Sequence, residues 1–234
     1  MRPPLPEARV ERIIRERIAP RPTQWDYLHL AGLRRALADA LRQLPVSRGP
    51  VLDLFCGAQP YRSLIPWGPV WGLDIDLHFR RANVLGALPL PFRDDTFTVA
   101  LCTQALHLAS DPPAAVAELR RVLIPGGSVI VTVPHIFRRE IPAERKWTER
   151  DLRALFSGWR DVHVQGIGGP GRGLIFYPGS MAAAAGRRWP PARLALPVVG
   201  ITLTAAGTVL DTVLRPLANR WPESLILVAR RPGS

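Results

Sequence analysis

A short apolar run that ends in a tight turn constrains the fold of this chain more than any other feature. Residues 51–55 read Val-Leu-Asp-Leu-Phe and follow Gly49-Pro50. An almost wholly apolar run of this length is typical of a strand buried on both faces of a parallel sheet. Cys56-Gly57 then opens a turn, and Pro60 can begin a helix. This order predicts an open α/β fold, in which ligands bind where such strands end.

A second apolar run places an acid at the end of the next strand. Residues 70–76 read Val-Trp-Gly-Leu-Asp-Ile-Asp and are expected to form the neighbouring buried strand. Asp74 at its tip is placed to accept hydrogen bonds from both ribose hydroxyls of a nucleoside cofactor. Gly57 lets such a ligand approach the backbone closely, and the expected helix start offers N–H groups to a carboxylate or phosphate.

The turn differs from that of a dinucleotide-dependent dehydrogenase. Such an enzyme has the pattern G-x-G-x-x-G, because a pyrophosphate sits directly on bare backbone. The three glycine positions read Phe55, Gly57 and Pro60 in this chain. A cofactor without a pyrophosphate can be held with one glycine, so the sequence favours a different nucleoside cofactor.

The order of strand, glycine turn, second strand and acid resembles the class I S-adenosylmethionine (SAM)-dependent methyltransferases. Residues 121–127, Arg-Val-Leu-Ile-Pro-Gly-Gly, are similar to the Arg-Val-Leu-Lys-Pro-Gly-Gly segment of that family. The match is to its type 11-like methyltransferase domains. The resemblance implies SAM as the cofactor and a Rossmann-like α/β fold. In that fold a seven-stranded, mainly parallel sheet has the order 3-2-1-4-5-7-6, with helices on both faces.

The resemblance also implies which residues bind SAM. In the family, the acid of the first strand and the turn hold the methionine end, and the acid of the second strand holds the ribose. Asn83 stands where the family often has an acid, and its side-chain oxygen can accept a hydrogen bond from the adenine amino group. The expected cofactor-binding residues are Asp53, Phe55, Cys56, Gly57, Ala58, Tyr61, Asp74, Ile75, Asn83, Val84, Thr103 and Gln104.

Hydrophobic patterns place the remaining elements. The helix expected at residues 25–44 either closes the cofactor pocket, as is common in the family, or only covers the sheet. We divide the chain into an N-terminal extension, residues 1–24, and a methyltransferase domain, residues 25–234. Further strands are expected at 97–102, 128–133, 161–165 and 225–229, and further helices at 7–18, 111–123 and 148–156.

Residues 168–222 are expected to be a loop and an apolar helical insertion before the last strand. Residues 194–210 carry no charge, and the glycines of 166–173 predict a flexible loop in front of them. Three interpretations remain open for the insertion: a helix or helix pair packed over the active site, a peripheral membrane contact through 194–214, or a dimer face. Arginines flank the apolar run at positions 187, 188, 193, 215 and 220.

Composition bounds the compartment and the partners. Cys56 and Cys102 lie in predicted strand ends, which indicates buried thiols of a reducing compartment, and the N-terminus lacks the apolar stretch of a signal peptide. We therefore expect a cytoplasmic protein, membrane-associated only if the insertion provides the contact. The net charge is +12, but the arginines are scattered and Lys146 is the one lysine, a bias typical of GC-rich genomes. A dispersed charge disfavours a nucleic-acid partner.

Catalytic candidates follow from the chemistry of a sulfonium. Its leaving group departs neutral, so alignment supplies much of the rate, but a hydroxyl or carboxyl acceptor needs a base. His107 and His135 follow the expected fourth and fifth strands, and Glu140 and Glu144 are further candidates. Cys102 lacks the surrounding pattern of a cytosine-methylating nucleophile. The histidines and cysteines show no metal-binding spacing.

These observations predict a SAM-dependent methyltransferase that acts on a small-molecule, glycan or lipid-like acceptor. Two alternatives remain open. An RNA methyltransferase would explain the net charge and the Asp-Leu-Phe-Cys-Gly segment, which some RNA enzymes share. A non-catalytic SAM-binding subunit would bind the cofactor without turnover.

Overall fold

The computed structural model describes residues 3–45, 49–135, 147–217 and 221–233 of the chain. Among these residues, seven strands form one sheet in the order β3-β2-β1-β4-β5-β7-β6, which confirms the predicted fold class. The strands are β1 (Val51–Leu54), β2 (Val70–Asp74), β3 (Val84–Leu85), β4 (Phe97–Thr103), β5 (Leu123–Pro134), β6 (Arg160–Ile167) and β7 (Ser224–Arg230). The first five pair in parallel, and β7 runs antiparallel to both β5 and β6.

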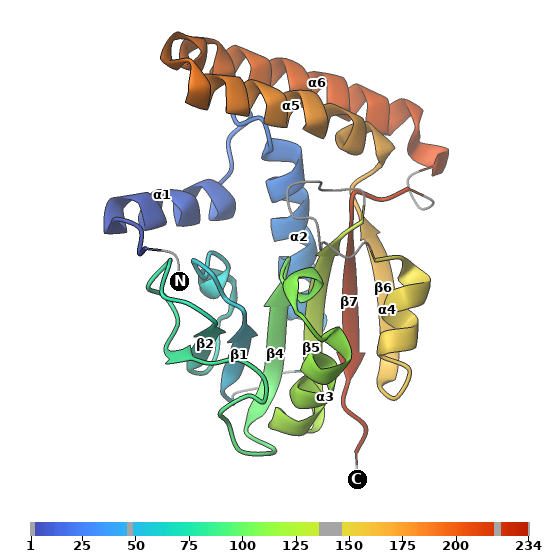
Figure 1. The fold of residues 1–234 in the computed structure, drawn as a ribbon. Coiled ribbons are helices and arrows are strands. Elements are labelled where there is room, and N and C mark those ends of the chain that lie inside the picture. Colours follow the sequence, from blue (N-terminus) through green and yellow to red (C-terminus); the bar gives the residue numbers. More distant parts are fainter. Residues whose placement is uncertain (1–2, 46–48, 136–146, 218–220, 234) are drawn as a thin grey trace.

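Helices cover both faces of the sheet (Figure 1). α2 packs on one face, and α3 and α4 pack on the other. α5 and α6 follow β6 and form a hairpin of two adjacent helices at one end of the molecule. The six helices of the described residues are α1 (Glu7–Ile18), α2 (Tyr27–Gln43), α3 (Pro112–Val122), α4 (Glu149–Leu155), α5 (Pro170–Arg188) and α6 (Leu196–Val213).

The apolar runs form strands because their side chains alternate between two cores. Val51 packs with α2, whereas Leu52 and Leu54 pack on the α3 side. In β4, Val99 and Leu101 face α2, and Ala100 and Cys102 face α3. A strand that is buried on both faces favours apolar residues at nearly every position, which explains these runs, and Asp53 is the exception in β1.

Helix starts and ends follow the capping residues. Asp111 accepts a hydrogen bond from the Ala114 backbone N–H at the start of α3, and two prolines follow it. Thr148 and Asp151 form a complete capping box at the start of α4. Both helices begin where the sequence predicts them.

Two local expectations are wrong. Pro60 does not begin an α-helix, because only a single 3-10 turn, η1 (Arg62–Leu64), follows it. Pro66 forces the residue before it, Ile65, into an extended conformation and ends the turn. The glycine-rich stretch 166–173 is not a loop throughout, because β6 continues to Ile167 and Pro170 begins α5.

Candidate active site

The turn after β1 is a strained bend that β2 holds in place. Phe55, Gly57 and Gln59 all have left-handed backbone conformations, with φ of 55°, 53° and 48°. The conformation is unfavourable for Phe and Gln, at about 1–2 kcal/mol each. The backbone N–H of Cys56 donates to the Leu73 carbonyl of β2 at 3.1 Å. Backbone strain of this kind collects at ligand-binding sites, so the bend is a candidate for such a site.

Asp74 ties the same bend to the tip of β2. Its Oδ2 accepts a hydrogen bond from the Gly57 backbone N–H at 2.9 Å, and its Oδ1 accepts one from Ile75 at 2.8 Å. Burial raises the pKa of Asp74, and these two hydrogen bonds oppose the rise. Each carboxylate oxygen has a second lone pair, so both can still accept a hydrogen bond from a ligand hydroxyl.

Asp53 is a buried acid directly behind the bend. Its side chain is 8% exposed. Burial and the charge of the Asp74 carboxylate raise the pKa of Asp53 to about 8, against the opposing effect of the Gln59 side chain. A bound cation would favour the ionised form. Asp53 is therefore suited to a ligand that carries positive charge.

Strand pairing places the predicted residues in one row at the carboxyl edge of the sheet. Leu54 pairs with Leu73, and Asp53 pairs with Leu101. If the same register continues beyond these pairs, Phe55 lies opposite Asp74 of β2 on one side. On its other side it lies opposite Thr103 of β4. This row is where the fold places ligands.

The turn after β4 repeats the strained geometry of the first bend. Gln104 has a φ of 52°, and its backbone N–H donates to the carbonyl and the hydroxyl of Thr132 at 2.8 and 3.0 Å. Thr103 and Gln104 are half-buried at this edge. The strand register places both residues beside the first bend, and their contact with the cofactor stays a prediction.

The residues expected around adenine have different surroundings. Ile75 is 64% exposed beside Asp74 and offers an open apolar surface. Asn83 forms two hydrogen bonds with Gly72. Its side-chain Oδ1 accepts from the Gly72 backbone N–H at 2.8 Å, and its backbone N–H donates to the Gly72 carbonyl at 2.8 Å. Val84 is half-buried in β3. Asn83 thus connects β2 to β3, and its contact with adenine stays a prediction.

Three of the predicted residues are packed inside the protein. Cys56, Ala58 and Tyr61 are buried. Burial raises the pKa of the Tyr61 hydroxyl to about 12, and burial also raises the pKa of the thiols of Cys56 and Cys102. Both thiols are therefore protonated, which agrees with the expectation that Cys102 is not a nucleophile. These side chains support the bend from behind.

The N-terminal segment covers the loop that follows Asp74. The Leu5 N–H donates to the His78 carbonyl at 2.8 Å, and Glu7 forms an ion pair with Arg81. Val10 of α1 is fully buried. The segment assigned to an extension is thus part of the surroundings of the site.

The two candidate histidines differ in geometry. His107 is buried in a 3-10 turn, η2 (Leu106–Leu108). His135 Nδ1 lies 2.8 Å from the Trp147 carbonyl, which can only accept, so Nδ1 carries a proton, and in the neutral ring Nε2 has the lone pair. His135 is therefore in the tautomer of a base. Glu140 and Glu144 lie outside the described residues.

A buried histidine–glutamate pair escapes sequence analysis. His29 Nδ1 lies 2.7 Å from Glu223 Oε1, and the Glu223 side chain is 1% exposed. Burial alone would lower the pKa of His29, but the charge and the hydrogen bond of Glu223 outweigh it and raise the pKa. The Glu223 carbonyl also accepts from the His135 N–H at 3.1 Å. No local pattern joins positions so far apart in the chain.

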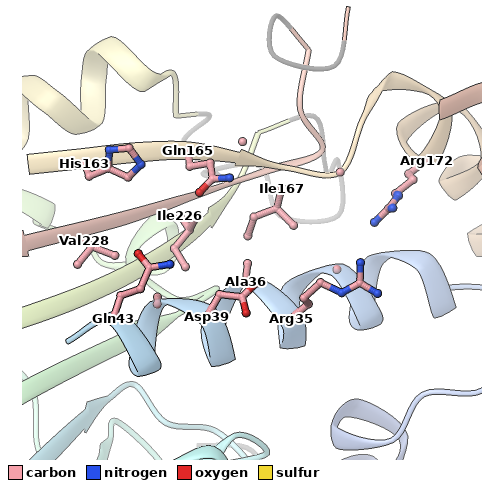
Figure 2. A pocket seen from close by; sticks show the side chains of 14 residues that line it. Arg35, Ala36, Asp39, Gln43, His163, Gln165, Ile167, Arg172, Ile226 and Val228 are labelled. Atoms are coloured by element: carbon pink, nitrogen blue, oxygen red, sulfur yellow. The ribbon is translucent and has the colours of Figure 1, made fainter. Parts of the chain in front are cut away.

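A hollow of about 260 Å³ lies elsewhere, between α2 and strands β6 and β7. Figure 2 shows Arg35, Asp39 and Gln43 of α2 facing Gln165 and Val228 across it. It is remote from the row at the carboxyl ends of β1, β2 and β4, so we do not assign the chemistry to it. The described residues contain no group of three or more His, Cys, Asp or Glu side chains that could hold a metal ion.

The sequence and the fold both resemble those of known proteins. Residues 53–131 match a family described as a methyltransferase domain. The comparison with curated protein sequences finds no match. The [4+2]-cyclase SpnF has a similar structure, with a TM-score of 0.57, 21% identity, and coverage of 89% of this chain and 83% of that chain.

Two further solved structures with this fold are methyltransferases. A SAM-dependent methyltransferase from Thermotoga maritima gives a TM-score of 0.54 and 14% identity, and covers 94% of this chain and 99% of that chain. Phosphoethanolamine N-methyltransferase 2 from Haemonchus contortus, in complex with SAM, gives 0.56 and 16%. That alignment covers 94% of this chain and 60% of the longer nematode protein. At these identities the structures support the fold.

Proposed function

We propose that this chain, a class I SAM-dependent methyltransferase, transfers the methyl group of its cofactor to a small-molecule, glycan or lipid-like acceptor. The observation that carries the proposal is the row of Asp74, the strained bend and Thr103 at the carboxyl edge, with the buried Asp53 behind it. One nematode neighbour is, by its name, a phosphoethanolamine methyltransferase, which is a precedent for a small acceptor on this fold.

The residues of the row fit SAM. Asp53, with its pKa raised to about 8, gains a favourable partner from the positive charge at the methionine end. Asp74 keeps lone pairs for the ribose hydroxyls. The exposed Ile75 offers an apolar surface to the adenine ring. When bound, the cofactor supplies an electrophilic methyl group.

The chain itself then has to align the acceptor and remove a proton. In-line displacement depends on alignment, which a rigid bend anchored to β2 can provide. The Nε2 lone pair of His135 can accept the acceptor's proton, and the Trp147 carbonyl holds the ring in that tautomer. Glu223, whose carbonyl accepts from the His135 backbone, fixes the start of β7 next to this histidine.

A labelling experiment tests the proposed function. The full chain is incubated with SAM that is radiolabelled on the methyl group and with a cell extract, and label is counted in the lipid, water-soluble small-molecule and RNA fractions. We expect label in the lipid or small-molecule fraction. Because a cyclase shares this fold, methyl transfer itself must be detected.

Two outcomes would overturn the proposal. Label in RNA alone, with a steep loss at higher salt, would indicate an RNA methyltransferase. No label in any fraction, although the chain binds S-adenosylhomocysteine, would indicate a non-catalytic SAM-binding subunit.

A further inference from the structure

The outward surface of the α5–α6 hairpin is the largest feature that the methyl-transfer site does not explain. Residues Pro190–Val213 are long and apolar enough to cross a membrane by length and composition, with a mean hydropathy of 1.6, and only 11% of the 18-residue apolar window within them is buried. Five side chains along α6 and its start are 52–86% exposed: Leu194, Val198, Ile201, Val209 and Val213. An apolar surface of this extent marks an interaction site.

The opposite side of α6 is committed to the protein. A Cβ atom at Gly200 would lie 2.2 Å from the Thr23 carbonyl oxygen, and one at Gly207 would lie 2.5 Å from Ile175. Both glycines are buried, so the helix backbone lies directly on its neighbours. α6 can therefore offer one face only, which suits insertion parallel to a membrane plane better than a crossing.

The threonine hydroxyl groups on the exposed face of α6 already donate hydrogen bonds to the helix backbone. Thr202, Thr208 and Thr212 are exposed, and each donates its hydroxyl proton to the backbone carbonyl four residues earlier, at 3.0, 2.8 and 2.8 Å. Threonines on a water-facing helix gain nothing from this arrangement, whereas in a membrane it leaves no donor unsatisfied. The face can thus leave water without losing hydrogen bonds.

The charges of the hairpin are positive where they are exposed. Asp211 is the one acid between residues 170 and 217, and its Oδ2 pairs with Arg172 Nε at 2.6 Å, with both side chains largely buried. Arg187, Arg188 and Arg193 are exposed at the turn between the helices. Their charge complements anionic headgroups, with about 1 kcal/mol expected for each arginine near such a surface.

In the sequence, an exposed tryptophan stands on each side of the apolar run. Trp189 is exposed before α6, and Trp221 is exposed after it. Tryptophan is enriched where hydrocarbon meets water in membrane proteins. Along the sequence, Trp189 and the turn arginines are followed by the apolar face of α6 and then by Trp221. This order is typical of a helix that lies in a membrane interface.

We propose that the α5–α6 hairpin inserts the outward face of α6 into a bilayer with anionic headgroups. Figure 1 shows the hairpin at the same end of the molecule as the carboxyl ends of the parallel strands. The methyl-transfer site then lies close to the membrane surface. Its acceptor is a molecule held in that membrane, a consequence that rests on the proposed function.

Flotation of the full chain with vesicles tests the proposal. The wild type is expected to float with vesicles that contain phosphatidylglycerol, and Ile201→Glu/Val209→Glu is expected to stay at the bottom of the gradient. Replacing the three turn arginines by Gln should weaken binding to these vesicles by on the order of a hundredfold. Trp71→Glu, which places the same charge on an exposed apolar residue of β2, should float like the wild type.

A fluorescent label gives a second readout. Both native cysteines are buried, so a single introduced cysteine can be labelled selectively. A polarity-sensitive dye on Val209→Cys should shift to the blue with anionic vesicles, whereas the same dye on Ser157→Cys, at the exposed end of α4, should not. Binding of S-adenosylhomocysteine by every variant shows that each is folded.

Three results would overturn the proposal. The first is a wild type that binds S-adenosylhomocysteine but does not float, together with a labelled Val209→Cys variant whose dye does not shift. The second is flotation that survives both glutamates. The third is a dimer in solution that these glutamates dissociate while vesicles have no effect, which would identify the face as an interface between two copies. A wild type that floats with the vesicles but transfers no methyl group would contradict the proposed function and would still support membrane binding.

Discussion

At the residue scale, two acids on adjacent strands divide the work of the site. Asp74 is held by two backbone N–H groups and closes the bend. Asp53 is buried, and its burial together with the charge of Asp74 raises its pKa to about 8. The difference follows from the surroundings, since burial disfavours a charge that hydrogen bonds do not compensate. Asp53 is therefore largely protonated at pH 7 in the absence of ligand.

The protonation of Asp53 predicts a pH dependence of cofactor binding. A cation beside Asp53 lowers the pKa of its carboxyl group. Below about pH 8, this carboxyl is therefore more protonated in the free protein than in the complex, and binding of the cation releases a proton. The affinity for SAM should therefore rise with pH up to about 8 and then stop rising through this group. Calorimetry in buffers of different ionisation enthalpy measures the released proton.

Asp53→Asn is the control for this effect. In this variant, protons that the groups of SAM release on binding are still released. The proton that Asp53 releases in the wild type should be missing. Equal proton release by the wild type and the variant would contradict the role of Asp53.

His135 carries a second prediction at this scale. His135→Gln should lower kcat by about a hundredfold or more, because the base is removed. Binding of S-adenosylhomocysteine should be unchanged, since His135 interacts with Trp147 and Glu223 and not with the bend. His163→Gln, on an exposed histidine of β6, is the matched control. Unchanged kcat in the His135 variant would exclude it as the base.

At the element scale, the ion pair of His29 and Glu223 fastens α2 to the start of β7. Because Glu223 raises the pKa of His29 above 6.5, the pair's contribution to stability is fully present below pH 6.5. It is lost as the pH rises through the raised pKa. Glu223→Gln should therefore reduce the free energy of unfolding by about 1.5–3 kcal/mol at pH 6, and by less at pH 9.

Urea unfolding at the two pH values checks this prediction. The control is Glu149→Gln, which removes an exposed helix pair with Arg153 and should cost less than about 0.5 kcal/mol. A loss of stability in Glu223→Gln that is equal at pH 6 and pH 9 would show that the charge of His29 is not involved.

Local sequence predicts elements well where a few neighbouring residues decide the outcome. The capping residues Asp111 and Thr148 are such cases, and so is the alternating burial in β1. The helix expected after Pro60 fails because Pro66 lies too close behind it. His29 and Glu223 could not be paired in advance, since only the assembled sheet brings α2 and β7 together.

At the scale of the whole molecule, one edge of the sheet concentrates the chemistry. The strand order could be expected from the resemblance, and it fixes which turns become neighbours: those after β1, β2 and β4. The role of the insertion at residues 168–222 could not be predicted from its composition. An apolar run fits a lid, a membrane contact and a dimer face equally, and only the packed side of α6 shows which face remains outside.

Methyl transfer at this site requires that SAM lies over the bend at residues 55–59 with its ribose on Asp74. Calorimetric titration with S-adenosylhomocysteine tests this most directly. The wild type should bind, and Asp74→Ala should bind at least about tenfold more weakly, since a hydrogen bond to a charged group contributes about 1.5–3 kcal/mol. Asp76→Ala, which loses only a contact to the His78 backbone, should bind like the wild type. A wild type that ignores both SAM and S-adenosylhomocysteine at millimolar concentration, or an Asp74→Ala variant that binds as tightly as the wild type, would contradict it.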